Sequence, residues 1–214
     1  AMGTWDNTLA TMPTPASNLC AAAIGNEIYI PGGWTGTAAL TDLQVYHIGS
    51  NSWEIVATDP RPAGRLAPAC AAFEGKLYVF GGDTGTGGGT NTAWVYDPAA
   101  PAGTRWTTLS SVPQNGAYGA ALWVNGLIFY GGASDNQSGN YAWVYGYDPA
   151  ADTWTAYPDL GTARGGAGMW AIDDVLLIGG GGWSSYLTSV EQYDTTQGTG
   201  GAWPPVEASL VQGR

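Results

Sequence analysis

The sequence repeats itself about every fifty residues, and this period constrains the fold more than any other feature. A glycine doublet occurs four times, at Gly32-Gly33, Gly81-Gly82, Gly131-Gly132 and Gly179-Gly180. Tryptophans recur on the same period, at Trp5, Trp53, Trp106, Trp154 and Trp203. A fixed period of this length is typical of a chain built from stacked supersecondary units, each of which buries its apolar face against a neighbour.

The pattern within each unit predicts four antiparallel strands. A β-rich run stands before every glycine doublet, and a tight turn of the kind that tolerates positive φ stands before every run. These turns are Gly25-Asn26, Glu74-Gly75, Asn125-Gly126 and Asp173-Asp174. A third strand ends near a Tyr-Asp pair such as Tyr147-Asp148, and a fourth strand carries the periodic tryptophan. We therefore predict an all-β fold of four-stranded antiparallel meanders.

Composition supports this fold class. Gly (34) and Pro (13) are frequent among the 214 residues, which leaves little room for long helices, while 44% hydrophobic residues are enough for a core. The apolar runs are far shorter than the ~20 residues that a membrane span requires, so we expect no membrane insertion.

The charge balance excludes one class of partner. Six basic residues stand against 17 acidic ones, which gives a net charge of −11. A nucleic-acid partner would need a cluster of Lys and Arg to neutralise its phosphates, so we expect no binding to nucleic acid.

The glycine doublet, the Tyr-Asp pair and the tryptophan, at these offsets, resemble the repeats of the kelch family. The resemblance implies a β-propeller with about four kelch-type blades in this chain. The units are expected at residues 16–64, 65–115, 116–163 and 164–213, preceded by an extra fourth strand at 4–15, within one propeller over 4–214. Residues 1–3 are expected to be a cloning scar. The family's arginine ahead of the first strand is matched at Arg65, Arg164 and Arg214, whereas Ala16 and Gly116 stand at the other two places.

The extra fourth strand leaves the number of blades in the assembled molecule open. Four blades could close on themselves, two chains could share a larger ring, or the chain could be a fragment of a longer propeller. We expect a fragment or a sub-assembly, in which the exposed edges promote association.

Two cysteines, Cys20 and Cys70, lie in similar settings with small apolar neighbours. We expect them to be a pair of buried thiols. The alternative is a disulfide, which requires the two backbones to lie within about 7 Å of each other.

The inventory of reactive residues argues against catalysis. The only histidine, His47, occupies the place of Asp97, Asp148 and Asp194 in the other units, so a surface turn is its expected setting. One His and two Cys cannot supply a zinc or copper site, which excludes the copper-radical oxidases that share the kelch architecture. Asp83 and the glycine-rich stretch that follows could hold Ca²⁺, but the alternating acids of a calcium loop are missing. We expect no cofactor.

Antiparallel topology predicts one face where binding residues gather. The connection between the second and third strands and the connection to the next unit emerge at the same end of each sheet, which we call the loop face. The expected ligand-binding residues there are Trp34, Asp83, Asp135 and Trp183 after the doublets, with Arg65, Arg164 and Tyr118 in the incoming segments. Aromatic rings beside polar groups suit a sugar or a polypeptide loop. Alternatively, the tryptophans cap the ends of their blades and the arginines tie adjacent loops through carbonyl groups.

We therefore expect a non-catalytic binding module, with a protein or glycan ligand on the loop face. Its polar, Gly-rich loops look like those of a secreted bacterial repeat domain within a larger protein, and an extracellular or cell-surface location is expected, with the cytoplasm as the alternative. Two other functions stay open: part of a carbohydrate-active propeller enzyme, and a structural or oligomerisation unit, such as a homo-dimer that completes the propeller.

Overall fold

The computed structural model describes residues 8–135, 137, 139–182, 185–207 and 209–213. Over these residues the chain is almost entirely β-structure, with one short 3-10 helix, η1 (Thr195–Gly200). The strands form four antiparallel sheets that follow one another along the chain. The predicted all-β fold of about four antiparallel units is confirmed.

The bounds of the strands follow the repeat. Sheet 1 contains β1 (Ala22–Ile24), β2 (Glu27–Pro31), β3 (Leu43–His47) and β4 (Ser52–Ile55). Sheet 2 contains β5 (Ala69–Phe73), β6 (Lys76–Phe80), β7 (Ala93–Tyr96) and β8 (Trp106–Thr108). Sheet 3 contains β9 (Ala120–Val124), β10 (Leu127–Gly131), β11 (Val144–Asp148) and β12 (Thr153–Tyr157). Sheet 4 contains β13 (Gly168–Ile172), β14 (Val175–Gly179) and β15 (Val190–Asp194).

In sheet 4 an irregular segment occupies the place of the fourth strand. The N–H of Val206 donates to the carbonyl of Val190 over 2.8 Å, and Pro205 forms a single bridge with Glu191. Residues 8–15, the described part of the extra strand expected at 4–15, likewise form no strand. Trp5 and residues 1–3 lie outside the described residues.

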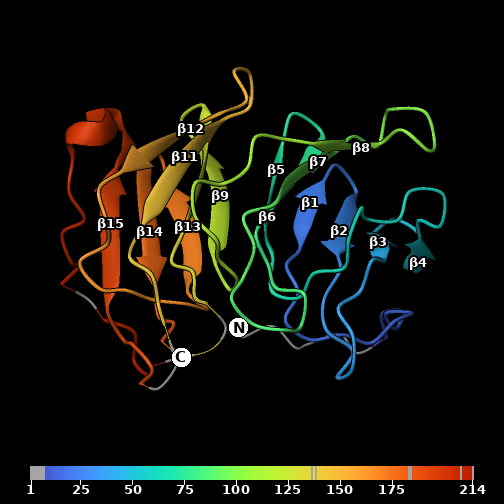
Figure 1. The fold of residues 1–214 in the computed structure, drawn as a ribbon, viewed down its shortest axis with the longest axis horizontal. Coiled ribbons are helices and arrows are strands. Elements are labelled where there is room, and N and C mark those ends of the chain that lie inside the picture. Colours follow the sequence, from blue (N-terminus) through green and yellow to red (C-terminus); the bar gives the residue numbers. More distant parts are fainter. Residues whose placement is uncertain (1–7, 136, 138, 183–184, 208, 214) are drawn as a thin grey trace.

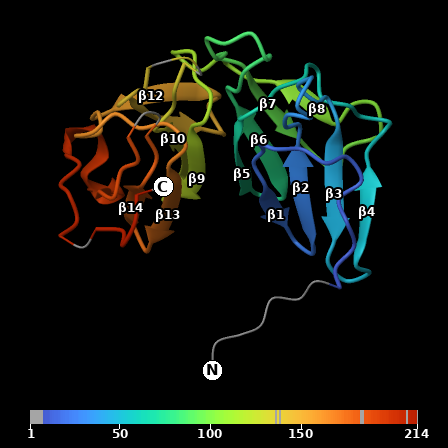
Figure 2. The ribbon, with the colours of Figure 1, turned by 90° about the horizontal axis from the view of Figure 1, so that it is seen from below.

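The four sheets lie along an arc (Figures 1 and 2). The first strand of each unit is the innermost, and β1 packs against β5, β5 against β9, and β9 against β13. Among the described elements, β1 and β13 do not form such a contact, and the arc stays open between them (Figure 2). Sheets 1 and 4 are therefore the two ends of the arc.

Each pair of neighbouring sheets encloses its own apolar core. We call the face of a sheet that is turned toward the next sheet its forward face, and the opposite one its backward face. Between sheets 2 and 3, Phe80 on the forward face packs edge-on against Trp154, with ring centroids 4.9 Å apart. Between sheets 3 and 4, the forward-face residue Phe129 lies in a cluster with Leu176 and Tyr193. The periodic apolar residues thus form a series of interfaces between blades rather than one central core.

The periodic tryptophans connect consecutive units through the backbone. The indole N–H of Trp154 donates to the carbonyl of Ser110 over 2.8 Å, and the N–H of Ser110 donates to Asp152 over 2.9 Å. The hydroxyl of Tyr147 donates to the same carboxylate over 2.7 Å. Ala10 is held in the same way, by Trp53 over 2.8 Å and by Asn51 over 2.7 Å. We call this arrangement the tryptophan latch.

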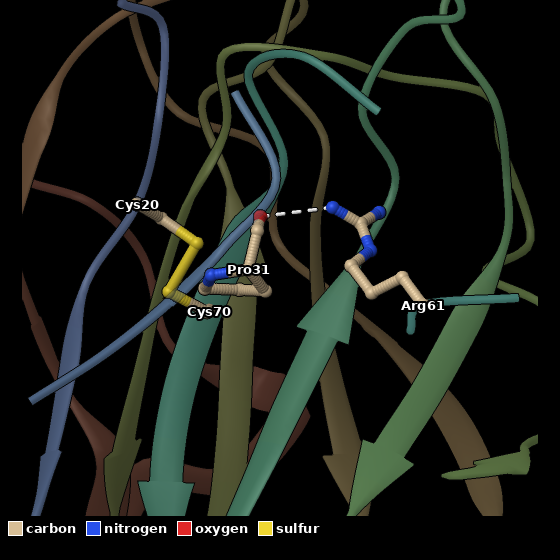
Figure 3. The surroundings of a disulfide bond; sticks show 4 residues. All are labelled: Cys20, Pro31, Arg61 and Cys70. Atoms are coloured by element: carbon tan, nitrogen blue, oxygen red, sulfur yellow. Dashed lines mark hydrogen bonds between the residues drawn. A yellow bond between two sulfur atoms is a disulfide. The ribbon is translucent and has the colours of Figure 1, made fainter. Parts of the chain in front are cut away.

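A disulfide joins sheets 1 and 2. Cys20 and Cys70 are bonded with their Cα atoms 5.9 Å apart (Figure 3), so the expectation of two free thiols is wrong. Cys20 lies on the forward side of unit 1, and Cys70 lies on the backward face of β5. The inner strands of adjacent blades run side by side, and this proximity brings the backbones within disulfide distance.

Candidate functional site

The segments that lead into the inner strands meet on the loop face through backbone hydrogen bonds. The N–H of Ala67 donates to the carbonyl of Asn18 over 2.5 Å, that of Tyr118 to Ala67 over 2.9 Å, and that of Gly166 to Tyr118 over 2.7 Å. All four residues have positive φ, between 48° and 70°. They occupy the same place in the four units, so a ladder of left-handed residues runs from blade to blade.

Side chains of this ladder line a pocket of about 150 Å³ between blades. Its walls are Asn18, Trp34, Leu66, Gly85 and Tyr118. The two aromatic rings are half-buried and pack against the small apolar cluster around Leu66. A pocket of this size accommodates one ring-sized group. Apolar walls with a single amide are typical of a site that holds one side chain of a larger partner.

The loop that follows β6 forms the edge of this pocket. Gly85 has a φ of 97°, and a Cβ atom there would stand 3.0 Å from the ring of Trp34. Further along, the N–H of Gly88 donates to the carbonyl of Asp135 over 2.7 Å. The loops of units 1, 2 and 3 are therefore in contact and form one continuous surface.

Asp83 and Asp135 organise these loops. The carboxylate of Asp83 is fully buried and accepts the N–H groups of Gly85, Gly87 and Gly89. The carboxylate of Asp135 accepts the N–H of Gly139 over 2.8 Å. Both oxygens of Asp83 receive backbone donors, so this carboxylate compensates N–H dipoles within the protein. The two aspartates therefore fix the backbone of these loops through hydrogen bonds within the loop face.

The two arginines also make internal contacts. Arg164 is fully buried, forms an ion pair with Glu191 over 2.5 Å, and donates to the carbonyl of Gly180 over 2.8 Å. Arg65 donates to the carbonyl of Gly64 over 2.7 Å and to Thr90 over 3.2 Å. These are the ties between loops that the sequence offered as the alternative to ligand binding.

Arg61, an arginine of unit 1 that was not predicted as a site residue, is buried beside Arg65. Arg61 donates to the carbonyl of Pro31 over 2.8 Å (Figure 3), and its guanidinium lies 5.2 Å from the ring centroid of Trp94. Burial, together with the positive charge of Arg65, lowers the pKa of Arg61 to about 9. The guanidinium of Arg61 is therefore out of reach of a ligand on the surface.

Of the seven expected site residues, the structure brings two together at the pocket. Trp34 and Tyr118 face it, and burial, aided by the charge of Asp83, raises the pKa of Tyr118, so its hydroxyl stays protonated at neutral pH. Trp183 lies outside the described residues. The sequence did not predict Leu66 and Gly85 as pocket walls. They line the pocket because unit 2 packs against units 1 and 3, and this packing is not visible within one unit.

Another cavity, of about 220 Å³, lies between sheets 1 and 2 at the opposite end of the strands. Its polar walls include His47, whose Nδ1 lies 2.9 Å from Glu27 and whose Nε2 lies 3.4 Å from Glu54. The hydroxyl of Tyr29 donates to the same Glu27. His47 therefore bridges two carboxylates at the end of β3 instead of standing alone in a turn.

The described part of the chain contains neither a cluster of metal ligands nor a helix that could span a membrane. Its His, Cys, Asp and Glu side chains form no group of three that could hold a metal ion. Among the same residues, no helix combines the length and the apolar character of a transmembrane segment.

Comparison with known proteins agrees with this architecture. A profile of the family described as the KLHDC2/KLHL20/DRC7 Kelch-repeats domain matches residues 19–209. Kelch-like protein terF of Aspergillus terreus is 30% identical in an alignment 191 residues long, which covers 81% of this chain and 40% of that protein. Kelch-like protein 15 of Danio rerio is 25% identical over 81% of this chain and 31% of its own length. N-acetylneuraminate epimerase of Pasteurella multocida is 33% identical in an alignment 120 residues long, which covers 53% of this chain and 30% of that enzyme.

The matched region contains all four sheets, and all of the ladder and the pocket except Asn18. The chain spans less than half the length of these relatives. Because the family profile covers nearly the whole chain, and because four successive units share the glycine doublet and the latch tryptophan, this protein belongs to the kelch-repeat family of β-propeller proteins.

Proposed function

We propose that this chain is a non-catalytic protein-binding module that holds a polypeptide loop on its loop face. Kelch-repeat proteins generally mediate protein–protein interaction. The observation that supports this site is the pocket between Trp34 and Tyr118, where two half-buried rings border a space of about 150 Å³. We propose that the partner inserts one apolar or aromatic side chain there, while Asn18 supplies a directional hydrogen bond.

Charge restricts the partner further. The chain carries a net charge of −11, and only six of its residues are basic. A strongly acidic partner would be repelled on approach, so we propose that the bound loop is neutral or basic.

A selection experiment tests the site. A library of disulfide-constrained peptides is displayed on phage and selected on the intact chain, and binding of the enriched peptides is measured by calorimetry. We expect Trp34→Ala to weaken the binding of these peptides at least tenfold, since aromatic anchors carry much of the binding energy in such pockets. Trp123→Ala is the matched control, because this tryptophan is 41% exposed and stacks on Phe73, away from the loop face.

The outcomes separate the candidate ligands. Peptides that bind wild type and Trp34→Ala equally well would contradict the proposed pocket. Binding to an array of neutral oligosaccharides that is lost in Trp34→Ala, without any enriched peptide, would contradict the protein partner and support a glycan ligand at the same site.

We also propose an extracellular or cell-surface location for a domain of a larger protein. The disulfide between Cys20 and Cys70 supports an oxidising compartment, because structural disulfides are rare in reducing ones. Relatives more than twice as long as the matched region support a larger host protein.

A further inference from the structure

The cavity between sheets 1 and 2 has an equivalent between sheets 2 and 3. Both have a volume of about 220 Å³ and lie at the end of the strands opposite the loop face. Pro98 lines the first cavity, and Pro149, which occupies the same place in the next unit, lines the second. The repeat itself therefore produces a gap at this place, and the side chains around each gap decide what it can bind.

Two residues of the first cavity depart from the pattern of the repeat. Glu54 follows the latch tryptophan of unit 1, and Arg105 precedes the latch tryptophan of unit 2. The other units with a regular fourth strand have small hydroxyl residues at these places, namely Thr107 and Thr155 at the first and Ser52 and Thr153 at the second. Although Glu54 and Arg105 belong to different units, both line the same cavity. One charge of each sign has thus been brought to one gap between blades.

The two charges do not neutralise each other within the protein. Glu54 lies 3.4 Å from Nε2 of His47, which is long for a hydrogen bond. Arg105 lies 3.7 Å from the buried Asp59 and donates from Nε to the carbonyl of Ala100 over 3.1 Å. Within the described part of the chain, Glu54 and Arg105 form no ion pair with each other. Both can therefore still bind a charged group in the cavity.

A tyrosine hydroxyl lies beside the arginine. Nη1 of Arg105 donates to the hydroxyl of Tyr96 over 3.2 Å. This hydrogen bond, together with the negative charges of Asp59 and Glu54, raises the pKa of Arg105, so the charge of Glu54 reaches the guanidinium. Burial raises the pKa of Tyr96, so its hydroxyl stays protonated at neutral pH and can donate to a ligand. The cavity thus presents a carboxylate from unit 1 and two hydrogen-bond donors from unit 2.

We propose that this cavity binds a free amino acid as a zwitterion. The ammonium group of the ligand pairs with Glu54, and its carboxylate accepts hydrogen bonds from Arg105 and Tyr96. Val45 and Val56 also line the cavity, so the side chain of the ligand has an apolar surface to contact. A ligand with only a negative charge would be repelled by Glu54, and a ligand with only a positive charge would leave Arg105 unpaired.

The wall formed by sheet 1 does not suit a metal ion as the ligand. His47 lies between Glu27 and Glu54, and these three side chains are not arranged as a metal site in the described structure. The proposal is also independent of the loop-face pocket, which lies at the other end of the strands. Failure of either proposal therefore leaves the other intact.

Calorimetry with the standard amino acids, each added to the intact chain, tests the site. We expect at least one of them to bind, and the tightest binder is then compared with its N-acetyl and carboxamide derivatives. Each derivative lacks one of the two charges, so we expect each to bind about tenfold more weakly or worse. Glu54→Thr and Arg105→Thr should weaken binding of the unmodified amino acid to a similar extent. Both variants introduce a residue that another unit already has at the equivalent place.

Lys76→Thr is the matched control, because Lys76 is a charged residue of the equivalent cavity between sheets 2 and 3. Its affinity for the amino acid should equal that of wild type. Glu54→Gln removes only the charge from a side chain that is 56% exposed, so it tests the ammonium contact without risk to the fold. Circular dichroism verifies that each variant is folded. The proposal would be overturned if no amino acid bound, if a blocked derivative bound as tightly as the zwitterion, or if folded Glu54→Gln and Arg105→Thr bound like wild type.

Discussion

At the residue scale, the loop face depends on backbone conformations that few residues adopt. Gly85 has a φ of 97° and lies against the ring of Trp34, whereas Gly88 has a φ of 96° and nothing within 4 Å of an added Cβ. Both glycines have a φ that would strain an L-residue, but only at Gly85 would an added Cβ meet a neighbouring atom. This difference separates the cost of the backbone conformation from the cost of the contact with the pocket.

We predict that Gly85→Ala lowers the free energy of unfolding by more than Gly88→Ala does. Both variants lose about 1–2 kcal/mol because an L-residue is strained at positive φ. Gly85→Ala loses about 1–3 kcal/mol in addition, because its methyl group overpacks against Trp34. Urea denaturation followed by tryptophan fluorescence measures the difference. Equal losses for the two variants would contradict the close contact between this loop and the indole.

Residue types on the loop face were easier to predict than their roles. The repeat places Asp83 and Asp135 on this face, but sequence alone does not show whether a carboxylate points outward or accepts N–H groups of its own loop. The glycines after Asp83 carry the missing signal, since closely spaced N–H groups without side chains can turn toward one carboxylate. Leu66 lines the pocket because of a neighbouring unit, and no pattern within its own unit indicates this.

At the element scale, the tryptophan latch couples each sheet to the segment that precedes it. In unit 3 the latch includes a charge, because Asp152 accepts hydrogen bonds from Ser110 and Tyr147. Partial burial raises the pKa of Asp152, but the hydrogen bonds from Tyr147 and Ser110 outweigh it, so this pKa lies below its usual value. In unit 1 the neutral Asn51 takes the same place.

We predict that the latch weakens in acid. The pKa of Asp152 is lower in the folded chain than the usual value of about 3.9 in the unfolded chain, so its contribution to stability is complete above that value. The contribution is lost as the pH falls through the folded-state pKa, because the unfolded chain takes up the proton first. Urea midpoints between pH 7 and pH 2 should therefore fall more steeply for wild type than for Asp152→Asn.

Asp159→Asn is the control for this experiment, because the structure records no hydrogen bond for this exposed aspartate. Its midpoints should follow those of wild type across the pH range. If Asp152→Asn also follows wild type, the carboxylate contributes no more to the folded state than an amide does.

The sequence predicted the elements well wherever the signal is local. The turns at Glu74-Gly75 and Asn125-Gly126 connect β5 to β6 and β9 to β10 in the expected register, because two-residue turns fix the pairing of the strands beside them. The fourth position of sheet 4 differs from the expected strand. Trp203 is buried there, but Pro204 and Pro205 follow it and cannot donate to a strand ladder.

At the scale of the whole molecule, the disulfide closes a loop of the chain through the first two blades. Cys20 and Cys70 are 50 positions apart, and the bond restricts the unfolded chain over that length. We predict that the double variant Cys20→Ser, Cys70→Ser loses about 2–4 kcal/mol of stability. Guanidinium denaturation with and without dithiothreitol measures this loss.

Reductant should destabilise wild type to the level of the double variant and should leave the double variant unchanged. A wild-type transition that does not respond to reductant, although a thiol assay shows that the bond is reduced, would mean that the cross-link adds nothing to stability.

The features that sequence reasoning could not supply all depend on distances between units. The similar sequence settings of Cys20 and Cys70 do not indicate how far apart the two residues lie in space. Arg61 is buried at the position that the apolar residues Val112 and Leu160 occupy in other units. A charged residue at this position does not indicate apolar surroundings. The openness of the arc is likewise set by the small rotation between neighbouring sheets. A repeat pattern specifies one unit and its neighbour, whereas such a rotation accumulates over the whole chain.

The ladder of left-handed residues has a consequence for how such a surface can change. Its bonds join backbone atoms only, and its four members are Asn18, Ala67, Tyr118 and Gly166. An amide, a methyl group, a phenol and a hydrogen atom are thus compatible with one backbone geometry. The side chains at these places can be exchanged while the blades keep their alignment, so selection can alter what the surface recognises with little change to the scaffold.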